Sequence, residues 1–226
     1  MNARCVSIAC STLISIALVC GGCASTGAKK AATESATVQG ITDDYRQARL
    51  QTQAVEEALA GLVVAPNPDL GQAFDFFTTN ATMMEDIGRR LITHADGMFY
   101  RGTYYFVETG KSLEACAIPR VGRMDEQRSI DLGKDFDAVS ETGGEVKRAY
   151  RAFQFDIKTV RDALGYNLTP AGLESVDLVL HKAQVDSDSL QAALDNALRA
   201  LDRAKSTLAQ QQVVPSSPAP VVPPQR

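Results

Sequence analysis

Two segments in the second half of the chain repeat apolar residues at alternating steps of three and four positions. The mean step of about 3.5 residues is the period of a coiled coil, so the pattern predicts two helices that wind gently around their neighbours. The earlier helix should end at Gly165, and the later one should begin after Thr169 with Pro170 in its first turn. The repeated positions are Leu132, Phe136, Val139, Gly143, Val146, Tyr150, Phe153, Ile157, Val160 and Leu164, then Leu173, Val176, Leu180, Ala183, Ser187, Leu190, Leu194, Ala197, Leu201, Ala204 and Leu208.

The first half of the chain carries a weaker form of the same pattern. One segment covers 41–62 and stops before the Pro66-Asn67-Pro68 breaker, and a second covers 70–105, from which the same count reaches Cys116. Short connections join antiparallel neighbours in helical bundles. The sequence therefore predicts an all-α fold, an elongated antiparallel coiled-coil-like bundle of three to four long helices over residues 41–212.

Two places in the sequence could interrupt these helices. Gly143-Gly144 is unfavourable in a helix interior. The run Met98–Val107 is rich in aromatic and β-branched residues and could form a small hairpin that turns at Arg101-Gly102. Because the apolar count passes through both places without slipping, we expect helix in each.

The bundle is flanked by two segments without an apolar period. Residues 23–40 are small and polar and should form a flexible tether, and residues 213–226 are rich in proline. We expect both tails to be disordered.

The N-terminus has the layout of a secretory signal, with Arg4, an uncharged apolar run and small residues before a cysteine. The stretch LVCGGCASTG resembles the cleavage site of a bacterial lipoprotein, in which 1–22 would be the signal peptide and Cys23 would receive the lipid. Cys20 departs from that pattern, which usually has a leucine-like residue there. A plain cleaved signal and a retained membrane anchor remain alternatives.

Composition and charge limit which cellular compartment and which partners are possible for this chain. The chain has 23 Lys plus Arg and 27 Asp plus Glu, and loss of Arg4 with the signal leaves 22 against 27, a net charge of −5. An acidic chain of this kind argues against a nucleic-acid partner. Four of the five cysteines lie in or beside the signal, so Cys116 has no intramolecular partner and is expected to be a buried thiol.

Motifs for catalysis, cofactors or metals are not recognisable. Gly110-Lys111-Ser112 ends like a phosphate-binding loop, but Tyr105 stands where its first glycine is required. The two histidines, His94 and His181, belong to no metal-binding pair, and we interpret both as surface or boundary residues. We therefore expect no enzyme activity, no cofactor and no metal.

One unusual feature is an aromatic cluster of five residues within eight positions, made of Phe99, Tyr100, Tyr104, Tyr105 and Phe106. It could form a locally thick core or a contact with a partner or a membrane surface. In a continued helix Tyr100 and Tyr104 would share one face, with Arg101 beside them. Tyrosine and arginine contribute strongly to protein interfaces, so these three residues are the candidate partner contact.

The segment AYRAFQFDIKTVRDALGYNLTPAGLESVDLVLHKA, residues 149–183, resembles a family of bacterial helical envelope lipoproteins of unknown function. The resemblance implies a helical coiled-coil body and assigns no activity and no functional residues. Together with the N-terminus, it leads us to expect a periplasm-facing helical rod that is held in a membrane by its lipid and serves as a structural or adaptor protein. Ala24-Ser25 lacks the aspartate typical of inner-membrane retention, which favours the outer membrane. The alternative function is a bundle that binds a small ligand or a lipid.

Overall fold

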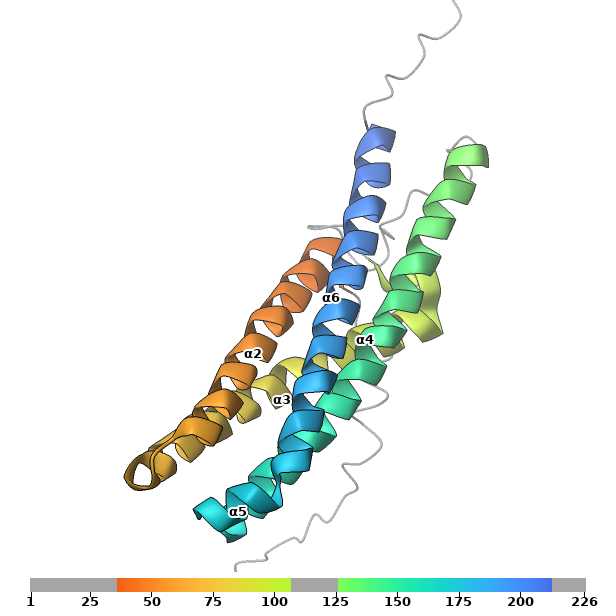
Figure 1. The fold of residues 1–226 in the computed structure, drawn as a ribbon. Helices are drawn as coiled ribbons and strands as arrows, with labels where there is room; N and C mark the ends of the chain where they lie inside the picture. Colours follow the sequence, from red (N-terminus) through yellow and green to blue (C-terminus); the bar gives the residue numbers. More distant parts are fainter. Residues whose placement is uncertain (1–35, 107–125, 213–226) are drawn as a thin grey trace, which may run out of the picture.

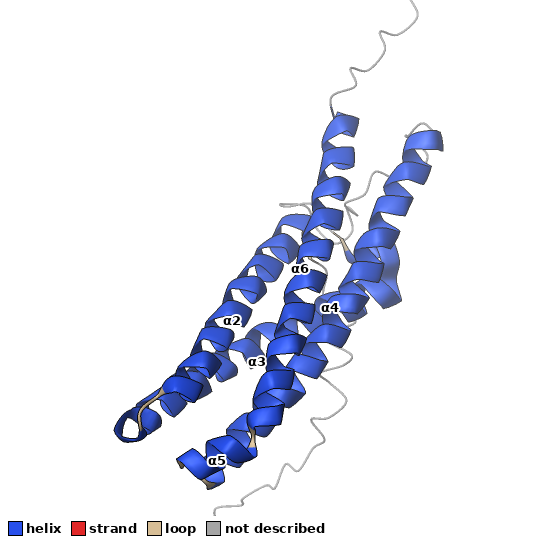
Figure 2. Ribbon diagram, viewed as in Figure 1, coloured by secondary structure: helices blue, strands red, loops and turns tan. Residues whose placement is uncertain are grey.

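The structure is a computed structural model that describes residues 36–106 and 126–212. It is an elongated, all-α bundle of antiparallel helices, as the sequence predicts (Figures 1 and 2). The turns around Pro66 and Asn167 are short, and the predicted short connection around Pro119 lies outside the described residues. No helix in the described ranges combines the length and the apolar character that a membrane span needs. The predicted signal peptide, Cys23, Cys116 and the proline-rich tail lie outside the described residues. The helices are α2 (Val38–Val64), α3 (Leu70–Arg101), α4 (Glu126–Tyr166), α5 (Pro170–Ser175) and α6 (Asp177–Gln212), with the short 3-10 helices η1 (Asn67–Asp69) and η2 (Gly102–Tyr105).

The first hairpin is formed by α2 and α3. The side chain of Thr37 accepts a hydrogen bond of 2.9 Å from the backbone N–H of Gly40 and so caps the start of α2. Helix α2 therefore begins inside the stretch 23–40 that we expected to be a flexible tether. It ends at Val64, and Ala65 after it is extended because Pro66 follows.

The second hairpin is formed by α4 and the pair α5 and α6. Helix α4 runs without a break through Gly143-Gly144, as predicted. Thr169 caps α5 by accepting a hydrogen bond of 3.1 Å from the N–H of Gly172, and Pro170 lies in the first turn. The predicted fourth helix is interrupted at Val176, so its first six residues form the separate helix α5.

The core follows the predicted apolar positions. In α2, α4 and α6 nearly all of them are buried, including the polar Ser187. Two glycines at repeated positions, Gly88 of α3 and Gly143 of α4, let large side chains of facing helices approach closely. A Cβ on Gly88 would overlap the ring of Tyr150, and a Cβ on Gly143 would overlap the end of Met98. The apolar repeat therefore continues through Gly143, because Met98 leaves room only for a small residue at that position.

The prediction of a continuous helix over Met98–Val107 is wrong. Helix α3 ends at Arg101 because Gly102 adopts a φ of 52° and donates its backbone N–H to the carbonyl of Met98. The chain then turns back through η2, and the N–H of Ala36 donates to the carbonyl of Tyr105 at 3.0 Å. The alternative hairpin turning at Arg101-Gly102 is not present in the described part of this run either.

The two hairpins pack side by side but differ in extent (Figure 1). At one end α4 and α6 extend together beyond α2 and α3. At the other end lie the turn between α2 and α3 and the short helix α5, and here the tips of the two hairpins stand apart.

Candidate functional site

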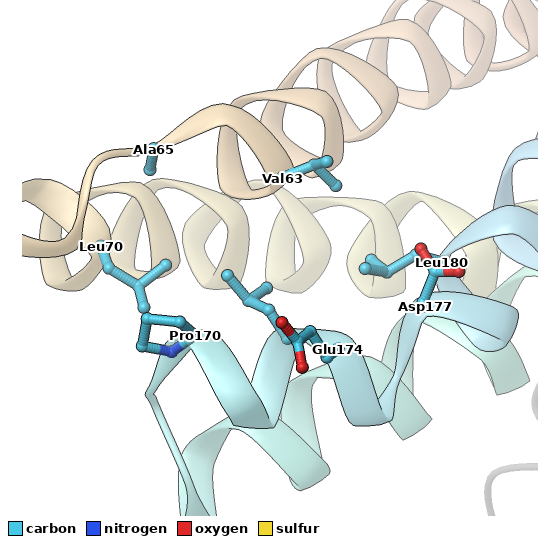
Figure 3. A pocket seen from close by; sticks show the side chains of 8 residues that line it. Val63, Ala65, Leu70, Pro170, Glu174, Asp177 and Leu180 are labelled. Carbon is cyan, nitrogen blue, oxygen red and sulfur yellow. The ribbon is translucent and has the colours of Figure 1, made fainter.

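A groove opens between the hairpin tips. One part of it is a cavity of about 400 Å³, which side chains from both hairpins line (Figure 3). The first hairpin contributes Val63, Ala65 and Leu70, and the second contributes Pro170, Leu173, Glu174, Asp177 and Leu180.

Each wall of the groove has a local cause in the sequence. On the first hairpin, Pro66 ends α2 at Val64, one residue after Val63, and the chain returns at Leu70, which is buried. On the second hairpin, the Thr169 cap and Pro170 fix the start of α5. The interruption at Val176 then redirects the chain between α5 and α6.

The groove continues along α2 and α6. A second cavity of about 220 Å³ shares Val63, Asp177 and Leu180 with the first, and its remaining lining residues are Leu59, Ala60, His181 and Gln184. We call the two cavities together the hairpin groove. On α6 its lining residues recur at steps of three and four, so they lie along one face of that helix.

The hairpin groove combines an aliphatic lining with polar and acidic side chains. Its charged residues are Glu174 and Asp177; both are exposed, and neither forms an ion pair with another described residue. The lining contains no serine, cysteine or lysine that could act as a nucleophile. No cluster of three potential metal ligands occurs in the described ranges. The aliphatic part of the lining is suited to binding an apolar group.

A second site, which is polar, surrounds His94. From the sequence, we interpret this histidine as a surface or boundary residue. That interpretation is wrong, because the side chain is only 7% exposed and both ring nitrogens are engaged. Nε2 lies 2.7 Å from Oδ2 of Asp44, and Nδ1 lies 2.7 Å from the hydroxyl of Tyr105. Arg90 donates to Oδ1 of the same Asp44 at 2.9 Å. Because these partners lie far apart in sequence, no local motif could have revealed them.

The protonation of His94 follows from its surroundings. Burial lowers the pKa of its imidazole, and the hydrogen bond with Asp44 opposes that shift only in part. In the neutral form Nε2–H donates to Asp44, and Nδ1 accepts the hydroxyl proton of Tyr105. This chain of groups resembles a catalytic relay, but Tyr105 is only 1% exposed. The network instead fastens η2 to α2 and α3.

A shallow cavity of about 470 Å³ adjoins this network. It is lined by Ala36, Asp86, Arg89, Arg90, Thr93, His94 and Tyr105. Its arginines already face carboxylates: Arg89 pairs with Asp86, and Arg90 pairs with Asp44. With its positive charges neutralised in this way, the cavity offers little to an anionic ligand.

The structure divides the predicted aromatic cluster. Tyr100 is 73% exposed, and its ring meets that of Phe99 edge to face at 5.1 Å. Arg101 is half-buried at the end of α3. Tyr105 and Phe106 are buried, and Phe106 packs against Phe136 of α4 at 4.5 Å between ring centroids.

The predicted shared face of Tyr100 and Tyr104 does not exist. Tyr100 belongs to α3, whereas Tyr104 lies in η2 after the turn at Gly102, so the two are not four positions apart on one helix. The side chain of Tyr104 is outside the described set. Of the predicted contact, Tyr100 is exposed and Arg101 is half-buried beside it at the end of α3.

Comparison of the chain with family models, with characterised proteins and with solved structures finds no significant match. The resemblance of residues 149–183 to helical envelope lipoproteins stays a prediction. Function must therefore be inferred from the geometry and chemistry of this chain.

Proposed function

We propose that this chain is a docking, or adaptor, protein of the bacterial cell envelope, built as a helical rod that a lipid on Cys23 holds at the membrane, facing the periplasm. The observation that carries the docking role is the hairpin groove, an open surface that aliphatic side chains from both hairpins line beside two carboxylates. Concave apolar surfaces with a few polar groups are the usual form of binding sites.

The proposed location rests on the sequence. The basic start, the apolar run and Gly21-Gly22-Cys23 support cleavage after Gly22 and lipidation of Cys23. Ala24-Ser25 supports retention in the outer membrane. We do not assign an enzymatic role or a nucleic-acid partner.

Fractionation of cells tests the anchor. Cys23→Ser should accumulate as uncut precursor or as soluble protein, whereas Cys116→Ser should fractionate with the membrane like the wild type. Normal processing and membrane retention of Cys23→Ser would contradict the proposal. Docking is tested by photo-crosslinking from Val63 of the groove in intact cells, where a discrete protein adduct would support the proposal.

A second candidate function is the binding of a small apolar ligand or a lipid. The cavity of about 400 Å³ favours it, because ligand pockets commonly measure about 300–1,000 Å³. Native mass spectrometry of the purified chain tests this candidate. A bound molecule that is lost in the groove variant Leu173→Lys would support it. Detection of only the ligand-free mass, after purification under non-denaturing conditions, would count against it.

A further inference from the structure

We infer that the hairpin groove binds an amphipathic helical segment of a partner protein, with apolar side chains on one face and lysine or arginine beside them. The inference rests on the proposed docking function and names the class of partner. It is carried by three features of the groove, which are its apolar walls, the sign of its charges and the spacing of its lining residues.

The apolar walls provide the first part of the argument. Leu70 and Leu180 form buried parts of the lining, whereas Val63 is 58% exposed at the edge. On the facing hairpin, Pro170 is exposed and Leu173 is half-buried. Aliphatic side chains of a bound segment would remove this surface from water, which favours association in proportion to the apolar area covered.

The charges determine which segment fits. The lining holds two carboxylates and no lysine or arginine. Asp177 lies in the first turn of α6, where a negative charge favours the helix dipole and needs no ligand to explain it. Glu174 lies three residues before α6 and, like Asp177, is exposed and has no ion-pair partner among the described residues. A lysine or arginine of a partner would complement the charge of both carboxylates.

The spacing favours a helix as the bound segment. Asp177, Leu180, His181 and Gln184 line one face of α6 over about 10 Å, at 1.5 Å per residue. Leu59, Ala60 and Val63 line the facing side of α2. Helices α2 and α6 are in direct contact here, since Gln184 donates a hydrogen bond of 2.7 Å to Glu56. A helix lying over the two would meet both with residues three or four apart, the spacing used when a helix binds along an apolar groove.

The test measures binding of two synthetic helical peptides to the purified full chain by fluorescence anisotropy. Both peptides carry the same leucine face, and they differ only in having lysines or glutamates beside it. We expect the lysine peptide to bind at least tenfold more tightly. Equal affinities would overturn the charge argument.

Matched variants separate the groove from general attraction to an acidic protein. Glu174→Gln with Asp177→Asn should weaken the lysine peptide at least fivefold, whereas Asp137→Asn with Asp202→Asn, which removes two exposed acids outside the groove, should change its affinity less than twofold. Val63→Lys should abolish binding, and Leu50→Lys, also at an exposed aliphatic residue of α2, should not. Equal effects within either pair would overturn the inference.

Further outcomes distinguish this inference from the proposals on which it rests. A fluorescent fatty acid that binds in a way that depends on Val63 but not on Glu174 and Asp177, with no binding of the lysine peptide, would overturn the inference in favour of a small apolar ligand. A partner crosslinked at Val63 in cells through an acidic or uncharged segment would overturn the inference and leave the docking role intact. Tight lysine-peptide binding by a chain that is never processed or anchored would support the inference and contradict the envelope role.

Discussion

Gly88 of α3 lies directly against the ring of Tyr150 of α4, so closely that a Cβ at Gly88 would overlap the ring atoms. Both residues are buried, and both lie on positions of the apolar repeat. The hole left by one glycine is thus filled by a tyrosine from the facing helix. This contact sets how closely the two hairpins approach in the middle of the bundle.

Gly88→Ala should therefore destabilise the protein although alanine is the better helix former. The gain in helix propensity is about 1 kcal/mol, and the overlap with a confined aromatic ring should exceed it, leaving a net loss of about 1–2 kcal/mol. Gly133→Ala on α4 is the control, because its Cβ would have no atom within 4 Å, and it should stabilise by up to about 1 kcal/mol. Urea unfolding measures both, and equal stabilisation by the two variants would contradict the packing described.

Tyr105→Phe should destabilise the fold by removing the hydroxyl that lies 2.7 Å from Nδ1 of His94. A buried acceptor left without its donor costs about 1–3 kcal/mol. Tyr100→Phe removes the same atom from an exposed ring and should change the free energy of unfolding by no more than about 0.5 kcal/mol. Thermal unfolding compares the stability of the two variants. If Tyr100→Phe lost as much stability as Tyr105→Phe, the hydroxyl of Tyr100 could not be exposed as described.

The stability of the protein should depend on pH through His94. Burial lowers the pKa of this imidazole in the folded state from its ordinary value of 6.5, so the unfolded chain takes up the proton first as pH falls. The free energy of unfolding should therefore be at its full value above about pH 6.5 and decrease as pH falls from there toward the lower folded pKa, by at most about 1.4 kcal/mol per pH unit.

His94→Gln supplies the comparison for this pH effect. The carboxylates titrate in both proteins, so the difference between wild type and variant isolates the histidine. Between pH 7 and 5 the variant should show a shallower decrease in the free energy of unfolding. Parallel curves over this range would mean that burial does not shift the pKa of His94.

The sequence predicts the repetitive part of this fold well, because an apolar repeat reports directly which side of a helix is buried. Leu190, Leu194 and Leu201 are fully buried as their spacing requires. The prediction from the repeat is wrong at Gly102, because the spacing of apolar residues does not show that this glycine adopts a positive φ and ends the helix. Tyr105 still falls on a counted position and is still buried, but η2 brings it there rather than a continued helix.

The candidate sites were much harder to predict. The contact between Asp44 and His94 joins two helices through residues that share no motif, so it appears only when the hairpin is folded. The hairpin groove arises because two helical tips stand apart, a property of the packing that no single segment encodes. The Pro66 breaker and the Thr169 cap marked the two turns that form its walls, but nothing in either turn indicated a space between them.

The central claim is that a partner docks in the hairpin groove, and site-specific photo-crosslinking in intact cells tests it most directly. A photoreactive residue replaces Val63 in one strain and Leu50 in another, since both side chains are exposed on α2 and only Val63 lines the groove. The account predicts one discrete protein adduct from Val63, reduced by Glu174→Gln with Asp177→Asn, and none from Leu50. The same adducts from both positions, or no adduct from Val63, would contradict it.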